Sequence, residues 1–210
     1  MEQIPAPAKE RLLYLMRLLE HGGAGETVTS AQIEALTGWA SHTVRKDISF
    51  LGAAVEGGRV GSSGGYAPAA LAALIKRALG LEIRRKFCVV GLGRLGSAYL
   101  NVSDLSGGEF ELAAGFDTNV NRTEILKSPA PLYPAYKMAE VIGRFGIEIA
   151  LLCVPAEAAQ TAAERLAAAG IRGILNFAPV AVTVPPGIAV RNVYLTDELR
   201  SLSIKITNNK

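Results

Sequence analysis

A glycine-rich turn near the middle of the chain constrains the fold more than any other segment. Residues 91–96 read Gly-Leu-Gly-Arg-Leu-Gly and come directly after an apolar run at residues 86–90. A G-x-G-x-x-G that follows a strand and opens a helix is typical of a dinucleotide-binding βαβ unit. Gly91 permits the tight turn, Gly93 lets the backbone approach a pyrophosphate, and Gly96 lets helix and strand pack closely. The helix N-terminus then offers unpaired N–H groups to the phosphates.

An acidic residue follows at the position that such a unit needs. Asp117 comes directly after a second apolar run, about 20 residues beyond the last glycine. A carboxylate there accepts hydrogen bonds from ribose hydroxyls and repels a 2′-phosphate, which favours NAD(H) over NADP(H). Arg122, five residues further on, weakens that preference. The alternatives are a glycine-rich turn that binds nothing and a site for another nucleotide such as coenzyme A.

Strand and helix patterns alternate through the second half of the chain. Apolar runs favour strands, and amphipathic or Ala-rich runs bounded by Pro and Gly favour helices. The expected strands cover residues 86–90, 110–116, 148–154, 171–177 and 187–193, and the expected helices cover 93–102, 137–144 and 155–169. This alternation predicts an α/β fold, namely a Rossmann-like doubly wound parallel sheet.

The first half of the chain has the pattern of a small helical domain. Helices are expected over residues 9–20, 31–36, 42–51 and 68–79, with Thr29 or Ser30 capping the second and Ser41 capping the third. The Gly-rich residues 55–66 suit a hairpin or wing. Two short helices joined by a Gly-containing turn match the helix-turn-helix signature, so we predict a winged helix-turn-helix.

The second helix of that pair carries side chains suited to DNA. Arg can donate two hydrogen bonds to guanine O6 and N7, and Ser, Thr and backbone N–H groups can fix phosphates. The candidate DNA-binding residues are Ser41, His42, Thr43, Arg45 and Lys46 on the helix and Arg59 in the wing. The alternative is a small helical domain in which these residues form a solvated face. The net charge is only +3, so DNA binding would depend on a local arrangement of charge.

The changes from helical to alternating strand and helix patterns divide the chain into three parts. We expect a winged-helix domain over residues 1–80, a Rossmann domain over 81–193 and a C-terminal helix within 194–210, with residues 84–86 as a linker. The last segment carries Leu199 and Leu202 at helical spacing beyond the final strand, which suits a docking arm.

Composition favours a cytoplasmic globular protein. Half of the residues are hydrophobic and 20% are charged, which supplies a core without a signature of disorder. No apolar run approaches the roughly 18–20 residues that span a bilayer, and the N-terminus lacks the pattern of a signal peptide. Cys88 and Cys153 lie in apolar runs, so we expect two buried thiols, and they form no metal-binding pattern.

The second half lacks the groups that a dehydrogenase uses. A nicotinamide dehydrogenase usually needs a general acid or base near the hydride. The two histidines, His21 and His42, lie outside the expected dinucleotide domain. We therefore expect no enzyme, and the bound nucleotide would act as a signal. A dehydrogenase with a helical oligomerisation domain remains an alternative.

Two longer motifs resemble a known family. Residues 44–52, Val-Arg-Lys-Asp-Ile-Ser-Phe-Leu-Gly, are similar to the recognition helix of the Rex family of bacterial redox-sensing repressors. Residues 170–180, Gly-Ile-Arg-Gly-Ile-Leu-Asn-Phe-Ala-Pro-Val, resemble a second hallmark of that family. Two departures stand out: the segment between Gly52 and Tyr66 is longer than the compact wing of the family, and Tyr194 occupies a position where Asp is common.

The resemblance implies a homodimer whose C-terminal helix swaps onto the partner. It implies a repressor that binds double-stranded, palindromic operator DNA with NAD⁺ or without NADH and is released by NADH. Arg45 and Lys46 carry over as DNA contacts. The implied cofactor-binding residues are Gly91, Leu92, Gly93, Arg94, Leu95, Gly96, Asp117, Val154, Pro155, Asn176, Phe177, Ala178 and Pro179.

Overall fold

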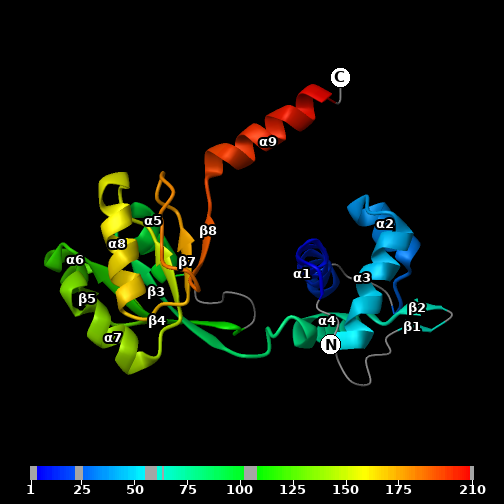
Figure 1. Cartoon of the computed structure of the whole chain (residues 1–210), viewed down its shortest axis with the longest axis horizontal. Coiled ribbons are helices and arrows are strands. Elements are labelled where there is room, and N and C mark those ends of the chain that lie inside the picture. Colours follow the sequence, from blue (N-terminus) through cyan, green and yellow to red (C-terminus); the bar gives the residue numbers. More distant parts are fainter. Residues whose placement is uncertain (1–3, 22–25, 55–60, 63, 102–107, 209–210) are drawn as a thin grey trace. The chain divides into compact units, whose positions relative to one another are not determined.

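A computed structural model describes residues 4–21, 26–54, 61–62, 64–101 and 108–208 of the 210-residue chain. The chain forms two compact units, Met1–Ile83 and Arg84–Lys210. Each unit has its own hydrophobic core and is described by itself (Figure 1).

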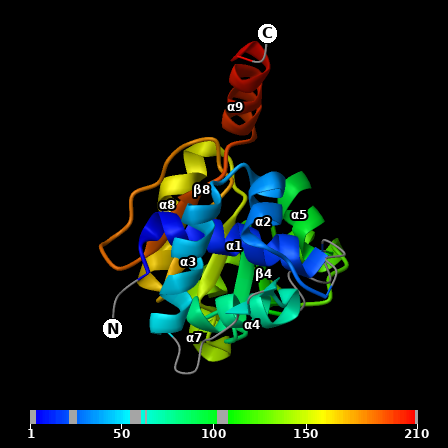
Figure 2. The same ribbon diagram turned by 90° about the vertical axis from the view of Figure 1, so that its right-hand side faces the viewer.

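The first unit is a winged helix-turn-helix. Its elements are α1 (Ala6–His21), α2 (Ser30–Thr37), α3 (Ser41–Ala54), β1 (Gly61–Ser62), β2 (Gly65–Tyr66) and α4 (Pro68–Ala78). Figure 2 shows the helices α1, α3 and α4 of this unit. Their apolar side chains share one core, in which Leu12, Leu51 and Ile75 are fully buried. Strands β1 and β2 pair antiparallel and form the hairpin that follows α3.

Local signals explain the helix-turn-helix. Thr29 caps α2 in a capping box with Gln32, and Gly38 ends this helix in the left-handed region at φ 74°. The prediction that Ser41 caps α3 is wrong, because Ser41 is already the first residue of this helix. Its hydroxyl instead donates to the Glu34 carboxylate and lies 3.3 Å from the Ser30 carbonyl oxygen, so it ties α3 to α2.

The second unit contains a six-stranded parallel sheet. The strands are β3 (Arg85–Val90), β4 (Phe110–Asp117), β5 (Leu132–Pro134), β6 (Ile149–Leu152), β7 (Gly173–Asn176) and β8 (Ala189–Asn192). Their order is β5-β4-β3-β6-β7-β8, and every neighbouring pair is parallel. From β3 the strand order runs to one side through β4 and β5, and from β6 it runs to the other side through β7 and β8. Ligands of such sheets bind at the carboxyl ends of the strands at this switch point.

Helices pack on both faces of this sheet. They are α5 (Arg94–Leu100), α6 (Val120–Ile125), the short 3-10 helix η1 (Ala135–Lys137), α7 (Met138–Phe145) and α8 (Ala156–Ala168). The last helix, α9 (Leu195–Asn208), follows β8 and projects away from the sheet (Figure 1). Cys88 and Val90 of β3 join a core with α7 and α8, whereas Phe87 and Val89 join a second core with Leu100 of α5. Burial on both faces is the expected state of a doubly wound sheet, so the predicted fold class is confirmed.

The structure corrects the predicted elements in two places. Arg85 and Lys86 open strand β3, so the linker predicted over residues 84–86 is wrong for these two positions. The short helix α6 and the strand β5 were not predicted, because their short segments carry little periodic signal. The expected C-terminal helix is present as α9, and its Leu195, Leu199 and Leu202 are exposed.

Candidate nucleotide cleft and recognition helix

The glycine turn has the geometry that its spacing predicts. Gly91 has φ +90°, and a Cβ there would lie 2.6 Å from the Cys153 carbonyl oxygen. A Cβ on Gly96 would overlap the carbonyl oxygen of Gly91, so the third glycine is needed for packing within the turn. A Cβ on Gly93 would meet none of the described atoms within 4 Å, which leaves its outer face open to a ligand. The turn therefore fits a pyrophosphate at the N-terminus of α5.

Asp117 closes this turn from the neighbouring strand. Its Oδ2 accepts a hydrogen bond from the backbone N–H of Leu92 at 2.7 Å, and its Oδ1 accepts one from the N–H of Asn119 at 2.7 Å. Arg122 Nη1 also donates to Asp117 Oδ2 at 3.3 Å. The Asp117 carboxylate is only 4% exposed because these groups surround it. It therefore shapes the turn, and it also lines the cleft.

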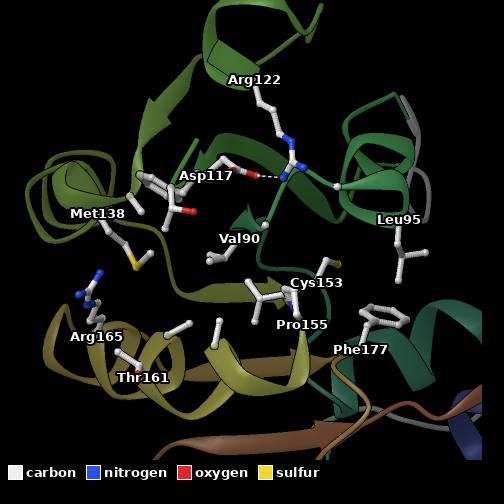
Figure 3. A pocket seen from close by; sticks show the side chains of 18 residues that line it. Val90, Leu95, Asp117, Arg122, Met138, Cys153, Pro155, Thr161, Arg165 and Phe177 are labelled. Atoms are coloured by element: carbon white, nitrogen blue, oxygen red, sulfur yellow. Dashed lines mark hydrogen bonds and ion pairs between the residues drawn. The ribbon is translucent and has the colours of Figure 1, made fainter. Parts of the chain in front are cut away.

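A cleft of about 720 Å³ opens at the carboxyl ends of β3, β4 and β6 (Figure 3). Leu95, Cys153 and Phe177 gather at one end of it, and Met138, Thr161 and Arg165 lie at the other. Clefts of this size, largely apolar and with a few polar groups, are typical small-molecule sites. The prediction that Cys153 is core is wrong in part, because this half-buried thiol lines the cleft.

Seven of the expected cofactor-binding residues line the cleft together: Gly91, Gly93, Leu95, Asp117, Val154, Pro155 and Phe177. The others, Leu92, Arg94, Gly96, Asn176, Ala178 and Pro179, are not among the residues that line it. Leu92 and Ala178 are buried, at 2% and 1% exposure, and Pro179 lines a neighbouring cavity beside Tyr99 and Phe177.

Asn176 holds the loop that follows β7. Its side chain is fully buried, its Nδ2 donates to the Val180 carbonyl at 2.8 Å and to Asn192 Oδ1 at 2.9 Å, and its Oδ1 accepts from the N–H of Ala178 at 3.0 Å. These bonds position Phe177 at the cleft. Asn176 therefore acts on the cleft through the loop that it holds.

Sequence reasoning missed the α8 wall of the cleft. Ala158, Thr161, Ala162 and Arg165 face it from this helix. Their spacing of three, four and seven residues marks one helical face, which was the available signal. Met138 at the start of α7 completes this wall.

The second helix of the helix-turn-helix exposes its basic residues. Arg45 and Lys46 are exposed, whereas the next residue, Asp47, is only 4% exposed. Arg45 Nη1 donates to Ser30 Oγ at 3.0 Å, so α2 orients this guanidinium. His42 is exposed and Thr43 is half-buried at the start of α3. Arg59 lies outside the described residues.

Glu34 of α2 anchors the first turn of α3. Its Oε2 accepts hydrogen bonds from the backbone N–H of Ser41, at 3.1 Å, and from its hydroxyl. The bonds to Ser41 hold the pKa of the Glu34 carboxyl below its ordinary value. A carboxylate at this position suits the positive end of the α3 dipole.

Comparisons with known proteins decide the family. The redox-sensing transcriptional repressor Rex of Thermus thermophilus is 39% identical to this chain over 99% of its length and 96% of the relative. The Rex proteins of Ligilactobacillus salivarius and Rhodopirellula baltica are 35% and 36% identical over 95% and 98% of this chain and 92% and 86% of the relatives. The chain belongs to the Rex family of redox-sensing transcriptional repressors.

Solved structures of the Rex family agree with this assignment. The Rex-family repressor RSP is 26% identical and superposes with a TM-score of 0.82 over 100% of this chain and 96% of that chain. Its complex with β-NADH superposes with a TM-score of 0.85, over 97% of that chain. Its complex with β-NAD⁺ and operator DNA gives a TM-score of 0.82, over 95% of that chain. A second family, described as CoA binding domain, matches residues 83–180.

The part of the chain that the structure describes contains neither a membrane-spanning helix nor a cluster of metal ligands. None of its helices is long and apolar enough to cross a bilayer. Likewise, the described His, Cys, Asp and Glu side chains form no cluster of three or more that could hold a metal ion.

Proposed function

We propose that this Rex-family chain is a DNA-binding transcriptional repressor that senses the ratio of NADH to NAD⁺. The observation that carries the proposal is the presence, in one chain, of an outward-facing recognition helix and of a cleft built on a G-x-G-x-x-G turn. The repressor binds operator DNA with NAD⁺ or without NADH, and NADH releases it. The cofactor therefore acts as an effector, and the chain is not an enzyme.

The cleft offers each part of a dinucleotide a suitable environment. The N–H groups at the start of α5 receive the pyrophosphate beside Gly93, and Asp117 accepts from the adenosine ribose. Leu95, Cys153 and Phe177 make the opposite end apolar. Reduced nicotinamide is uncharged, whereas NAD⁺ carries a ring charge that is costly to bury without a partner. This end therefore favours NADH.

Residues 1–80 serve as the winged-helix domain, with α3 in the major groove. Arg45 is suited to guanine, whose O6 and N7 accept its two parallel N–H groups. The DNA backbone is contacted from the same helix by Lys46, Thr43, His42 and Ser41. Residues 81–193 form the NAD(H)-binding domain and residues 194–210 the C-terminal arm.

The protein acts as a homodimer in the cytoplasm, where its DNA lies. Leu195, Leu199 and Leu202 of α9 are 54–72% exposed, and a second copy of the chain offers the apolar partner that this stripe requires. A two-fold dimer matches a palindromic, double-stranded operator with half-sites one helical turn or a multiple of it apart.

Linkage connects the two sites. NADH lowers DNA affinity only if it binds the DNA-incompetent arrangement more tightly, and DNA must then weaken NADH binding by the same factor. A coupling free energy of about 1–3 kcal/mol would change affinity roughly 5- to 150-fold.

The test is operator binding by the full-length protein, on duplexes selected from random DNA, titrated with NADH and with NAD⁺. We expect NADH to release the DNA and NAD⁺ to retain it. Equal DNA affinity with either nucleotide and with none would refute the sensing role.

The match to CoA-binding domains favours coenzyme A as a second candidate ligand. Coenzyme A would make the chain a regulator that responds to acyl or thiol pools. Calorimetry with NADH and with coenzyme A, each alone, separates the two, and binding of coenzyme A without NADH would favour the second. Turnover of an alcohol or hydroxy acid with NAD⁺ would instead support a dehydrogenase.

A further inference from the structure

The charge of Asp117 is largely compensated inside the protein. A carboxylate offers about four lone-pair sites, and three of them already receive the N–H groups of Leu92, Asn119 and Arg122. The Arg122 guanidinium also forms an ion pair with Asp117 Oδ2. Asp117 therefore keeps one acceptor site for a ribose hydroxyl but presents little net negative charge to the cleft.

Two arginine side chains line the cleft, one beside Asp117 and one further along the wall. Arg122 reaches Asp117 from α6, and its side chain is 51% exposed (Figure 3). Arg165 lies beside Met138 on the α8 wall, and its guanidinium has no partner among the described side chains. The charged residues that line the cleft are thus one carboxylate and two guanidinium groups, Asp117 against Arg122 and Arg165.

We propose that the adenosine end of the cleft accepts a ribose that carries a phosphate, and that Arg122 receives this phosphate. The inference rests on the proposed binding of a dinucleotide, which it extends to the phosphorylated class of adenosine cofactors. NADPH, with a 2′-phosphate, and coenzyme A, with a 3′-phosphate, are the two sources of this chemistry.

The physical reason lies in the pairing of Arg122 with Asp117. An acidic residue at this position rejects a ribose phosphate by repulsion, and a nearby Arg accommodates it. Here both residues are present and in contact at 3.3 Å. A guanidinium has five N–H donors, so Arg122 can keep one N–H on the Asp117 carboxylate and donate others to phosphate oxygens.

The first test compares NADH and NADPH by titration calorimetry on the full-length protein and on Arg122→Gln. We expect NADPH to bind the wild-type protein within about tenfold of NADH. Arg122→Gln should weaken NADPH by at least about tenfold and NADH by less than about threefold, because only the phosphorylated ribose uses this guanidinium. Arg172→Gln is the matched control, since this exposed arginine pairs with Glu148 at the amino ends of β6 and β7, whereas the cleft opens at the carboxyl ends of the strands.

Competition against NADPH identifies the source of the phosphate. The probes are adenosine 2′,5′-bisphosphate, adenosine 3′,5′-bisphosphate and 5′-AMP, which lacks a ribose phosphate. Preference for the first indicates the NADP(H) class, and preference for the second indicates coenzyme A. In either case the preferred bisphosphate should lose its advantage over 5′-AMP in Arg122→Gln.

The outcomes separate this inference from the proposed function. NADH binding with NADPH more than tenfold weaker would overturn the inference and leave the NADH sensor intact. An equal loss of NADH and NADPH in Arg122→Gln, or no advantage of either bisphosphate over 5′-AMP, would also overturn it. Failure of the wild-type protein to bind NADH would instead refute the proposed function.

Discussion

Arg11 and Asp47 join α1 to the middle of the recognition helix through two hydrogen bonds. Arg11 Nε donates to Asp47 Oδ2 at 2.6 Å, and Nη2 donates to Oδ1 at 2.9 Å. Asp47 follows directly after Arg45 and Lys46, which are exposed, so one helical turn holds two outward cations and one buried anion. The pair therefore sets the rotation of α3 about its axis, and with it the direction of the basic residues.

Removal of this pair should destabilise the first unit. Arg11→Ala leaves the buried Asp47 carboxylate without its partner, and we expect the free energy of unfolding to fall by about 1–3 kcal/mol. Arg17→Ala, at an exposed position on the same helix, is the control and should change it by less than about 0.5 kcal/mol. Urea unfolding followed by helical circular dichroism measures both, and an unchanged transition in Arg11→Ala would contradict a structural role.

Two glycines of the same turn should respond differently to alanine. A Cβ on Gly96 overlaps the Gly91 carbonyl oxygen, so Gly96→Ala should lower the free energy of unfolding by about 3 kcal/mol or more. A Cβ on Gly93 meets no described atom within 4 Å and would project into the space for the ligand.

Gly93→Ala should therefore keep its thermal transition and lose at least about tenfold in NADH affinity. Differential scanning fluorimetry without ligand and NADH fluorescence titration give the two readouts. Normal NADH affinity in a folded Gly93→Ala protein would show that the dinucleotide does not approach this backbone.

Arg45 and Lys46 should make different contributions to DNA binding. Arg45→Ala should cost about 1–3 kcal/mol on the selected operator and relax the preference for one base pair, because it removes a bidentate contact to guanine. Lys46→Ala should weaken binding to all sequences and reduce the salt dependence, because it removes a phosphate contact.

Fluorescence anisotropy at several salt concentrations, on the operator and on single-base variants of it, distinguishes these effects. Neither variant should alter NADH affinity in the absence of DNA. Unchanged operator affinity in Arg45→Ala would mean that α3 does not read the DNA as proposed.

Both thiols should react slowly in the folded protein. Burial raises the pKa of Cys88 and of Cys153 from 9.0 to about 12. At pH 8 the thiolate fraction is then about a thousandfold lower than in the unfolded chain, and the thiolate is the species that reacts. Labelling with iodoacetamide, followed by peptide mass spectrometry, should show little modification without denaturant, and NADH should slow it further at Cys153, which lines the cleft.

The same shifts set the sign of a stability change in alkaline solution. Below about pH 9 the folded and unfolded chains both keep these protons, so the thiols have no effect on stability. Between about pH 9 and 12 only the unfolded chain releases them, and the free energy of unfolding should fall. The fall should be smaller in Cys88→Ala than in the wild-type protein. Fast labelling of Cys88 in the folded protein at pH 8 would contradict its burial.

The sequence predicted the residues at strong local signals, but it missed short elements and part of the cleft wall. Strong local signals placed the strand before Gly91 and the acid Asp117 at the end of β4, and they limited the cap of α2 to Thr29 or Ser30, of which the structure shows Thr29. Short segments such as β5 gave too little periodicity to be recognised. The interpretation of Cys153 as core followed its apolar neighbours, although the next residues, Val154 and Pro155, were already expected at the cofactor site; β6 ends beside the cleft.

The sequence alone determined the classes of element and the chemistry of the glycine turn. These depend on local rules, since helix capping, alternating apolar runs and the absence of a Cβ act over a few residues. Tertiary structure decided which groups meet. Leu92 and Asp117 are 25 residues apart, and Arg11 and Asp47 are 36 apart. Such contacts depend on the order of strands and the packing of helices. The bond by which Asp117 closes the glycine turn at Leu92 follows from that packing, whereas its contacts with Asn119 and Arg122 are local in the sequence.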